Sequence, residues 1–326
     1  MKAFRHASPA DVKGAVGAVQ QARKDGAAVT MAGGGSDVLG MMKDRLIAPD
    51  VVVSLKRIKG LDTIAAQGGG LTIGGLTTID AIGRDPVIRE HYRVLAEAAE
   101  GVAMPQIRNV ATIAGNVLQR PWCWYYRNGF NCFKNGGSIC YSAAGENQFH
   151  AIFGGGPSYI VHPSDTAPAL VALGASFRVV GPAGERTIPA AEFFALPTVN
   201  PARENVLHDD EVLVSVVVPA PPAGARSTYH KVMDREAWTH AVVSAAIVVE
   251  VNGGVCRSSR VVLGGVAPIP WRLPDVERML EGQRITPELA KRAGEAAVAG
   301  ARPLAKNRYK VPLTAAVVKR TLESLG

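Results

Sequence analysis

The sequence contains few cysteines, no long hydrophobic run and no cluster of basic residues. Only four cysteines occur among 326 residues, and three of them fall within residues 123–140. The net charge is +8, but no run of Lys and Arg is longer than two residues, so the sequence does not favour nucleic-acid binding. An anionic cofactor or an acidic partner surface accounts for such dispersed basic residues equally well.

The sequence also lacks the signatures of several enzyme classes. No Ser–His–Asp, His-Glu-x-x-His or paired-carboxylate constellation is evident, so we assign no catalytic residue. His240, within REAWTHAVVSAA, is expected to be a packed or capping histidine rather than a base.

The first residues, MKAFRHASPADVKGAVG, lack the apolar core of a signal peptide, and no apolar run reaches membrane-spanning length. We therefore expect no membrane span and a cytoplasmic protein, with export to the periplasm alongside a partner as the alternative. Cytoplasmic conditions keep thiols reduced, so the clustered cysteines indicate metal or catalytic chemistry rather than disulfides.

The length predicts about two domains, and the element pattern predicts the α+β class. Ser8 is expected to cap a first helix that has Pro9 at its first position and ends at Gly26. Strands and helices then alternate to about residue 83, whereas residues 120–160 show little periodicity.

A proline-rich linker is expected at residues 216–227, ahead of a smaller α+β domain. In that domain two strands are joined by an Asn-Gly-Gly turn, and three helices follow. We predict subdomains at 1–60 and 61–222, the second with a cysteine-rich insertion at 120–160, and a C-terminal domain at 223–326.

The segment AGGGSD, residues 32–37, follows a predicted strand, which is where phosphate-binding loops occur. Consecutive unhindered N–H groups can cradle a pyrophosphate. The segment fits neither the G-x-G-x-x-G nor the Walker pattern, which argues against a nicotinamide-type Rossmann site or a P-loop. A tight turn that needs glycine at positive φ is an equally good interpretation.

A second segment, QIRNVATIAGNVLQRP at residues 106–121, mixes small and polar residues. Small residues let a flat ring approach the backbone, while Thr and Asn supply hydrogen bonds. An ordinary buried turn is the alternative interpretation, and the segment alone favours it.

Taken together, six ordered segments resemble the FAD-binding medium subunit of the xanthine dehydrogenase, or molybdenum hydroxylase, family. They are AGGGSDVLGMMK, LTIGGLTTI, IRNVATIAGN, HPSDTAPALVALGA, YHKVMDR and VVLGGVAPIPWR. The resemblance covers nearly the whole chain. It implies a two-part FAD-binding region of the vanillyl-alcohol-oxidase-like type, which is not a Rossmann fold, and a smaller C-terminal α+β domain.

The resemblance also implies which residues bind FAD. These are Ala32, Gly33, Gly34, Gly35, Ser36, Asp37, Val38, Leu39, Thr77, Thr112, Gly115, Asn116, Asp165, Leu213 and Lys231. Without the resemblance, Asp165 would be interpreted as a helix N-cap and Lys231 as a solvated strand lysine.

One branch of the family carries an inserted loop whose four cysteines hold a 4Fe–4S cluster. Its flavoproteins are of the benzoyl-CoA-type reductase and periplasmic aldehyde oxidase kinds. The segment RPWCWYYRNGFNCFKNGGSICY lies where that loop belongs, and Cys123, Cys132 and Cys140 match three ligands. At the position of the fourth cysteine, in GGGPSYIVHPSD, this chain has Ser158.

The missing thiolate leaves several ligand sets open, because cubane clusters are usually held by four cysteines. Ser158, His150, His162 or water could complete a 4Fe–4S cluster, or a 3Fe–4S cluster could remain. Zinc held by three Cys and one His is the alternative metal, although the gaps of eight and seven residues are long for a zinc knuckle. A site without metal is also open, and Cys256 is expected to be a lone thiol.

The resemblance implies an electron path through several subunits. Electrons would pass from a molybdopterin cofactor on a large partner subunit, through 2Fe–2S centres on a small partner subunit, to FAD on this chain and then to an external acceptor. Such a heterotrimeric complex would oxidise an aldehyde or an N-heterocycle, and the chain would be inactive alone. A self-sufficient FAD-dependent oxidoreductase is the alternative function, and a metal-stabilised binding module is a third.

Overall fold

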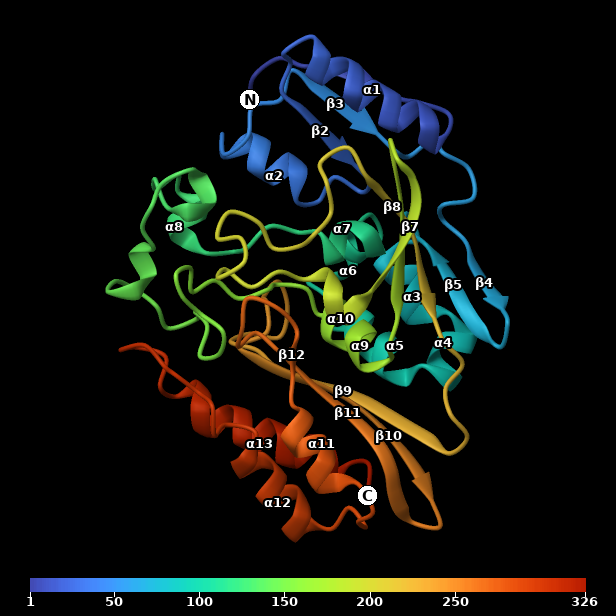
Figure 1. The fold of residues 1–326 in the computed structure, drawn as a ribbon, viewed down its shortest axis with the longest axis vertical. Helices are drawn as coiled ribbons and strands as arrows, with labels where there is room; N and C mark the ends of the chain where they lie inside the picture. The colour runs from blue at the N-terminus through green and yellow to red at the C-terminus, as the bar shows by residue number, and fades with distance from the viewer.

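Three β-sheets organise the protein, each built from a different stretch of the chain (Figure 1). The structure is a computed structural model that describes residues 1–326. The first sheet is three-stranded and parallel, in the order β1-β3-β2. Parallel strands need crossover connections, and helices α1 and α2 supply them. The elements are β1 (Arg5–Ala7), α1 (Val12–Lys24), β2 (Val29–Ala32), α2 (Val38–Lys43) and β3 (Val51–Ser54).

Helix α1 begins at Val12 and not at Pro9, so the prediction for this helix start was wrong. The carboxylate of Asp11 accepts a hydrogen bond from the Gly14 N–H at 2.7 Å, which makes Asp11 the N-cap in place of Ser8. This cap stands directly ahead of the apolar stripe with which the helix packs on the first sheet. The stripe consists of Ala15, Val16, Val19 and Ala22.

A five-stranded antiparallel sheet forms the middle of the molecule, in the order β4-β5-β8-β6-β7. Its strands are β4 (Ile64–Gln67), β5 (Gly70–Gly74), β6 (Ser176–Gly181), β7 (Gly184–Pro189) and β8 (Val212–Val218). The largest hydrophobic core, with 36 buried residues, lies between this sheet and its helices. These are α3 (Ile79–Arg84), α4 (Pro86–His91), α5 (Arg93–Glu100), α6 (Pro105–Arg108), α7 (Ile113–Val117), α9 (Thr166–Ala172) and α10 (Ala190–Phe193).

The cysteine-rich segment, residues 120–160, has little regular structure, as its lack of periodicity predicts. It contains the single turn α8 (Trp124–Arg127) and the 3₁₀ turns η1 (Phe133–Asn135) and η2 (Tyr141–Ala143). Figure 1 shows α8 beside α2, and the Tyr126 hydroxyl lies 3.6 Å from Met41 Sδ of that helix. The segment therefore packs on the amino-terminal part of the chain.

The C-terminal part is a four-stranded antiparallel sheet, in the order β12-β11-β10-β9, with helices on one face (Figure 1). Its elements are β9 (Ala225–Val232), β10 (Val243–Asn252), β11 (Val255–Gly264), β12 (Trp271–Arg272), α11 (Pro274–Leu280), α12 (Pro287–Ala296) and α13 (Lys310–Glu323). Gly253 and Gly254 join β10 to β11 at φ 59° and 78°. Positive φ at both turn residues is the geometry that the Asn-Gly-Gly pattern predicts.

The mixed helix-and-sheet architecture expected from the sequence is confirmed, with a C-terminal α+β part that has its own core of 23 buried residues. The sheets change in the connections 55–63 and 219–224, but the exact subdomain boundaries stay a prediction. None of the helices combines the length and apolar character needed to cross a membrane.

Candidate functional site

The glycine loop, residues 33–37, runs from β2 toward α2 and lies against the backbone of residues 110–112. A Cβ atom on Gly34 would stand 1.8 Å from the Val110 carbonyl oxygen, so no side chain fits there. Gly35 has φ +79°, which favours glycine. The tight-turn interpretation of this loop therefore holds, and the close packing of the two segments leaves the other side of the loop facing a cavity.

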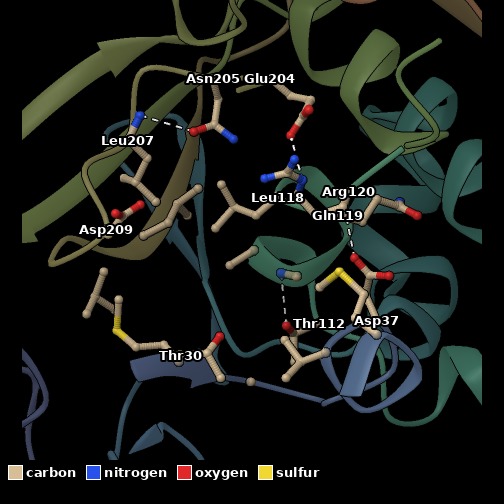
Figure 2. A pocket seen from close by; sticks show the side chains of 18 of the residues that line it. Thr30, Asp37, Thr112, Leu118, Gln119, Arg120, Glu204, Asn205, Leu207 and Asp209 are labelled. Atoms are coloured by element: carbon tan, nitrogen blue, oxygen red, sulfur yellow. Dashed lines mark hydrogen bonds and ion pairs between the residues drawn. The ribbon is translucent and has the colours of Figure 1, made fainter. Parts of the chain in front are cut away.

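That cavity has a volume of about 570 Å³, within the range of cofactor and ligand sites. Four stretches supply most of its walls: the glycine loop, the segment that starts at Thr112, the cysteine-rich segment through Tyr126 and Lys134, and residues 202–213, which lead into β8. Figure 2 shows Thr30 and Thr112 at one wall and Glu204, Asn205 and Leu207 at the opposite wall.

Thr112 and Asn116, both predicted to bind FAD, have different positions. Thr112 lines the cavity and caps α7, because its hydroxyl accepts a hydrogen bond from the Gly115 N–H at 3.2 Å (Figure 2). Asn116 is buried behind the wall, and its Oδ1 accepts hydrogen bonds from the hydroxyls of Ser164 and Thr166, each at 2.6 Å. Asn116 thus links α7 to the start of α9.

Most of the residues predicted to bind FAD line this one cavity. They are Gly33, Gly34, Gly35, Ser36, Asp37, Val38, Thr112, Gly115 and Leu213. The others lie outside its lining, and their contact with a cofactor stays a prediction. They are Ala32, Leu39, Thr77, Asn116, Asp165 and Lys231.

Asp165 and Lys231 form a buried ion pair with Nζ and Oδ2 2.8 Å apart. The Tyr229 hydroxyl donates to the other oxygen of Asp165 at 2.7 Å, and Lys231 also donates to the carbonyl oxygen of Gly101. Burial raises the pKa of Tyr229 well above its ordinary value, and the Asp165 charge adds to the effect. The side chain of Asp165 makes no cap hydrogen bond, and Lys231 is buried, so neither alternative interpretation of these residues holds.

Of the charged residues of the cavity wall, sequence reasoning named Asp37 but missed Arg120, Lys134 and Glu204. Asp37 accepts the Arg120 backbone N–H at 2.9 Å (Figure 2) and the Arg127 guanidinium at 2.8 Å. Glu204 is paired with Arg120 at 3.1 Å and with Lys134 at 2.7 Å. Burial lowers the pKa of Lys134, and the Glu204 carboxylate opposes that effect. The charge-rich run ARENVLHDDE, residues 202–211, was the one available signal for this wall.

Cys123, Cys132, Cys140 and Ser158 line a second, smaller cavity. All four cysteines are free thiols, and Cys256 lies apart from the others in β11. Nowhere in the chain are three His, Cys, Asp or Glu side chains placed to hold a single metal ion.

His150 and His162, the candidate histidine ligands, lie outside the lining of the small cavity. His150 Nε2 is 3.3 Å from Cys123 Sγ, and burial lowers the pKa of His150 to about 4. Burial likewise lowers the pKa of His162 to about 3, and its ring packs on Phe194. Burial raises the pKa of the Cys123 thiol to about 11. Ser158 thus lines the small cavity with the three thiols, while His150 contacts Cys123 from outside that lining.

The two cavities share a wall. Tyr126 and Lys134, both from the cysteine-rich segment, line the larger and the smaller cavity at once. Groups bound in the two cavities would be separated by the thickness of these side chains.

Two known protein families together match nearly the whole length of the chain. Residues 2–221 match the family described as the FAD binding domain in molybdopterin dehydrogenase, and residues 228–325 match the CO dehydrogenase flavoprotein C-terminal domain. The chain is 35% identical over 297 residues to the aldehyde oxidoreductase FAD-binding subunit of Escherichia coli K12, which covers 90% of this chain and 88% of that protein.

Carbon monoxide dehydrogenase of Hydrogenophaga pseudoflava gives a second similarity. Its medium chain is 28% identical over 326 residues, covering 98% of this chain and 96% of that protein. The solved structure of that enzyme matches with a TM-score of 0.78 at 28% identity, over 99% of this chain and 96% of that one.

Proposed function

This chain belongs to the family of FAD-binding medium subunits of molybdenum hydroxylases, and we propose that it carries FAD as the electron-transfer subunit of such a complex. The observation that carries the proposal is the cavity of about 570 Å³, because two segments of the resemblance, far apart in the chain, meet in its walls. The function is therefore that of an oxidoreductase subunit.

The residues at the cavity fit a dinucleotide. Gly33, Gly34 and Gly35 line the cavity, and the N–H groups of consecutive glycines, which no side chain shields, suit a pyrophosphate. We assign the pyrophosphate to this loop and the rest of the cofactor to the cavity that Thr112, Gly115 and Leu213 line. FAD supplies two-electron chemistry that can be divided into single-electron steps, while the chain supplies binding, orientation and exclusion of water.

Cys123, Cys132, Cys140 and Ser158 are the candidate ligands that line the small cavity together. The three thiols share this space with the hydroxyl of Ser158 and with that of Ser142, which lies 3.1 Å from Cys140 Sγ. We propose that Cys123, Cys132 and Cys140 hold a cluster of the 4Fe–4S kind and that Ser158 completes the set. A 3Fe–4S cluster, which needs only the thiols, is the other outcome of metal analysis.

The partners follow from the relatives rather than from a surface of this chain. The similar proteins are named as the FAD-binding subunit of an aldehyde oxidoreductase and the medium chain of carbon monoxide dehydrogenase. We propose a large molybdopterin subunit and a small 2Fe–2S subunit as partners, an aldehyde as the first substrate to test, and an external electron acceptor.

Anaerobic purification of the tagged full chain from its host tests the proposed function. We expect two further chains, molybdenum, and about one FAD per complex, with a visible flavin band near 450 nm. The isolated chain should carry FAD and oxidise no aldehyde. Purification as a lone chain that turns over substrate at the rate of a complex would contradict the proposal in favour of a self-sufficient oxidoreductase.

A further inference from the structure

The cysteine-rich segment forms part of the wall of the FAD cavity. Arg120, Tyr126 and Lys134 of this segment line the cavity together with the glycine loop and residues 202–213. The segment has only one helical turn and two 3₁₀ turns, so its own secondary structure cannot fix this wall. Contacts with the glycine loop and with residues 202–213 must therefore hold the segment in place.

The first contact joins the segment to the glycine loop. The two oxygens of Asp37 are both used: one accepts the Arg120 N–H at 2.9 Å and the other the Arg127 guanidinium at 2.8 Å. Arg127 also donates to the carbonyl oxygens of Arg120 and Pro121 and lies over the Trp122 ring, 4.3 Å from its centroid. Arg127 thus holds residues 120–127 of the cysteine-rich segment against the glycine loop.

The second contact joins the segment to the opposite wall. Lys134 Nζ is 2.7 Å from Glu204 Oε1, and the two side chains are 2% and 4% exposed. The ammonium also donates to the carbonyl oxygen of Arg203 at 3.2 Å. Without Lys134, the buried carboxylate of Glu204 would keep only Arg120 as a charged partner, at 3.1 Å, and a buried charge that is incompletely paired is strongly unfavourable. The pair therefore fixes the distance between two walls of the cavity.

We propose that Lys134 is a positioning residue of the FAD site, acting through Glu204, and that the ordered cysteine-rich segment and bound FAD stabilise each other. The inference rests on the proposed function. FAD needs both walls in place, and an ordered segment has already lost the conformational entropy that FAD binding would otherwise have to offset. Coupling of this kind is reciprocal, so a group that orders the segment from the other side, such as the proposed cluster, must strengthen FAD binding.

A double-mutant cycle on the full chain tests the role of Lys134. Lys134→Met is expected to raise the FAD dissociation constant roughly tenfold, a typical size for a coupling between sites. Adding Glu204→Gln should recover most of the affinity, because the buried carboxylate is then neutral and Arg120, its other partner, is 28% exposed and can be solvated. Arg272→Met is the matched control, since it unpairs another buried carboxylate, Glu277, in the C-terminal part. It should lower the melting temperature and leave FAD affinity unchanged.

Each possible outcome of these experiments contradicts a different part of the proposal. A double variant that binds FAD as weakly as Lys134→Met overturns the positioning role, because Lys134 then acts on FAD directly. Chelation of iron from the wild-type chain should weaken FAD binding, and unchanged affinity would overturn the mutual stabilisation. A chain that binds FAD but never contains iron contradicts the proposed cluster and leaves the Lys134 cycle to decide the inference. A chain that binds no FAD contradicts the proposed function itself.

Discussion

Asp165 and Lys231 form an ion pair, 2.8 Å apart, in which each side chain is only 5% exposed. Asp165 stands directly before α9, and Lys231 lies on β9, so the pair connects the FAD-binding region to the C-terminal sheet. The resemblance implies that both residues lie near the cofactor, but neither lines the cavity. We therefore expect the ion pair to contribute mainly to the folding stability of the chain.

Lys231→Met should destabilise the FAD-free chain by about 3–5 kcal/mol, the usual result of unpairing a buried charge. Urea unfolding of the FAD-free chain measures this without any contribution from cofactor binding. Lys291→Met, which removes an exposed lysine of α12, is the control and should change the unfolding free energy little. A loss below about 1 kcal/mol for Lys231→Met would show that the pair is not structural.

Gly34→Ala should give a flavin-poor protein, because its Cβ would stand 1.8 Å from the Val110 carbonyl oxygen and push the glycine loop away from residues 110–112. Gly40→Ala is the matched control, since a Cβ at that position in α2 meets nothing within 4 Å. The ratio of flavin absorbance to protein absorbance measures occupancy. Full occupancy in the Gly34 variant would remove the glycine loop from the FAD site.

Ser158→Cys should raise the iron content of anaerobically purified protein, because a fourth thiolate is a stronger ligand for iron than a hydroxyl. Cys132→Ser should lower the iron content, and Cys256→Ser should leave it unchanged, because Cys256 lies outside the small cavity. Iron and sulfide analysis with electron paramagnetic resonance provides the readout. Absence of iron from both wild type and Ser158→Cys would refute the cluster.

Lys310 should make stability depend on pH. Its ammonium is buried and donates to the carbonyl oxygens of Phe149 and Gly265 at 2.9 and 2.7 Å, and burial lowers its pKa to about 7. The unfolded chain keeps a lysine pKa of about 10.4 and so binds more protons between these values. This group therefore makes the unfolding free energy rise with pH from about 7 to about 10.

Lys310→Met removes that proton linkage, so wild type should gain stability relative to the variant as the pH rises from 7 to 9.5. Urea unfolding of both proteins at the two pH values measures the difference. Lys291→Met serves again as the exposed control and should follow wild type. Parallel pH profiles for wild type and Lys310→Met would contradict the lowered pKa.

The parts of the site that the sequence could predict are those carried by local motifs. Gly33–Val38 and Thr112 stand in short segments whose residue types indicate backbone approach and hydrogen bonding, and the structure places them at one cavity. The family resemblance added Leu213, which no local pattern singles out.

The parts that escaped prediction depend on contacts between distant segments. Lys134 and Glu204 become a buried pair only when the fold brings the cysteine-rich segment to residues 202–213, and neither residue stands out in its own segment. The wrong start predicted for α1 had a local cause: two residues that can cap a helix, Ser8 and Asp11, stand within one turn, and it is Asp11 that makes the cap hydrogen bond.

Anaerobic mixing of the purified complex with a substrate aldehyde tests most directly whether this chain receives electrons from partner subunits. The flavin absorbance near 450 nm is followed with time in the complex and in the isolated, FAD-loaded chain. We predict rapid bleaching of the band in the complex and none in the isolated chain. Equal bleaching in the isolated chain, or an unchanged flavin band in a complex that turns over, would contradict the assignment of this chain as the electron-transfer subunit.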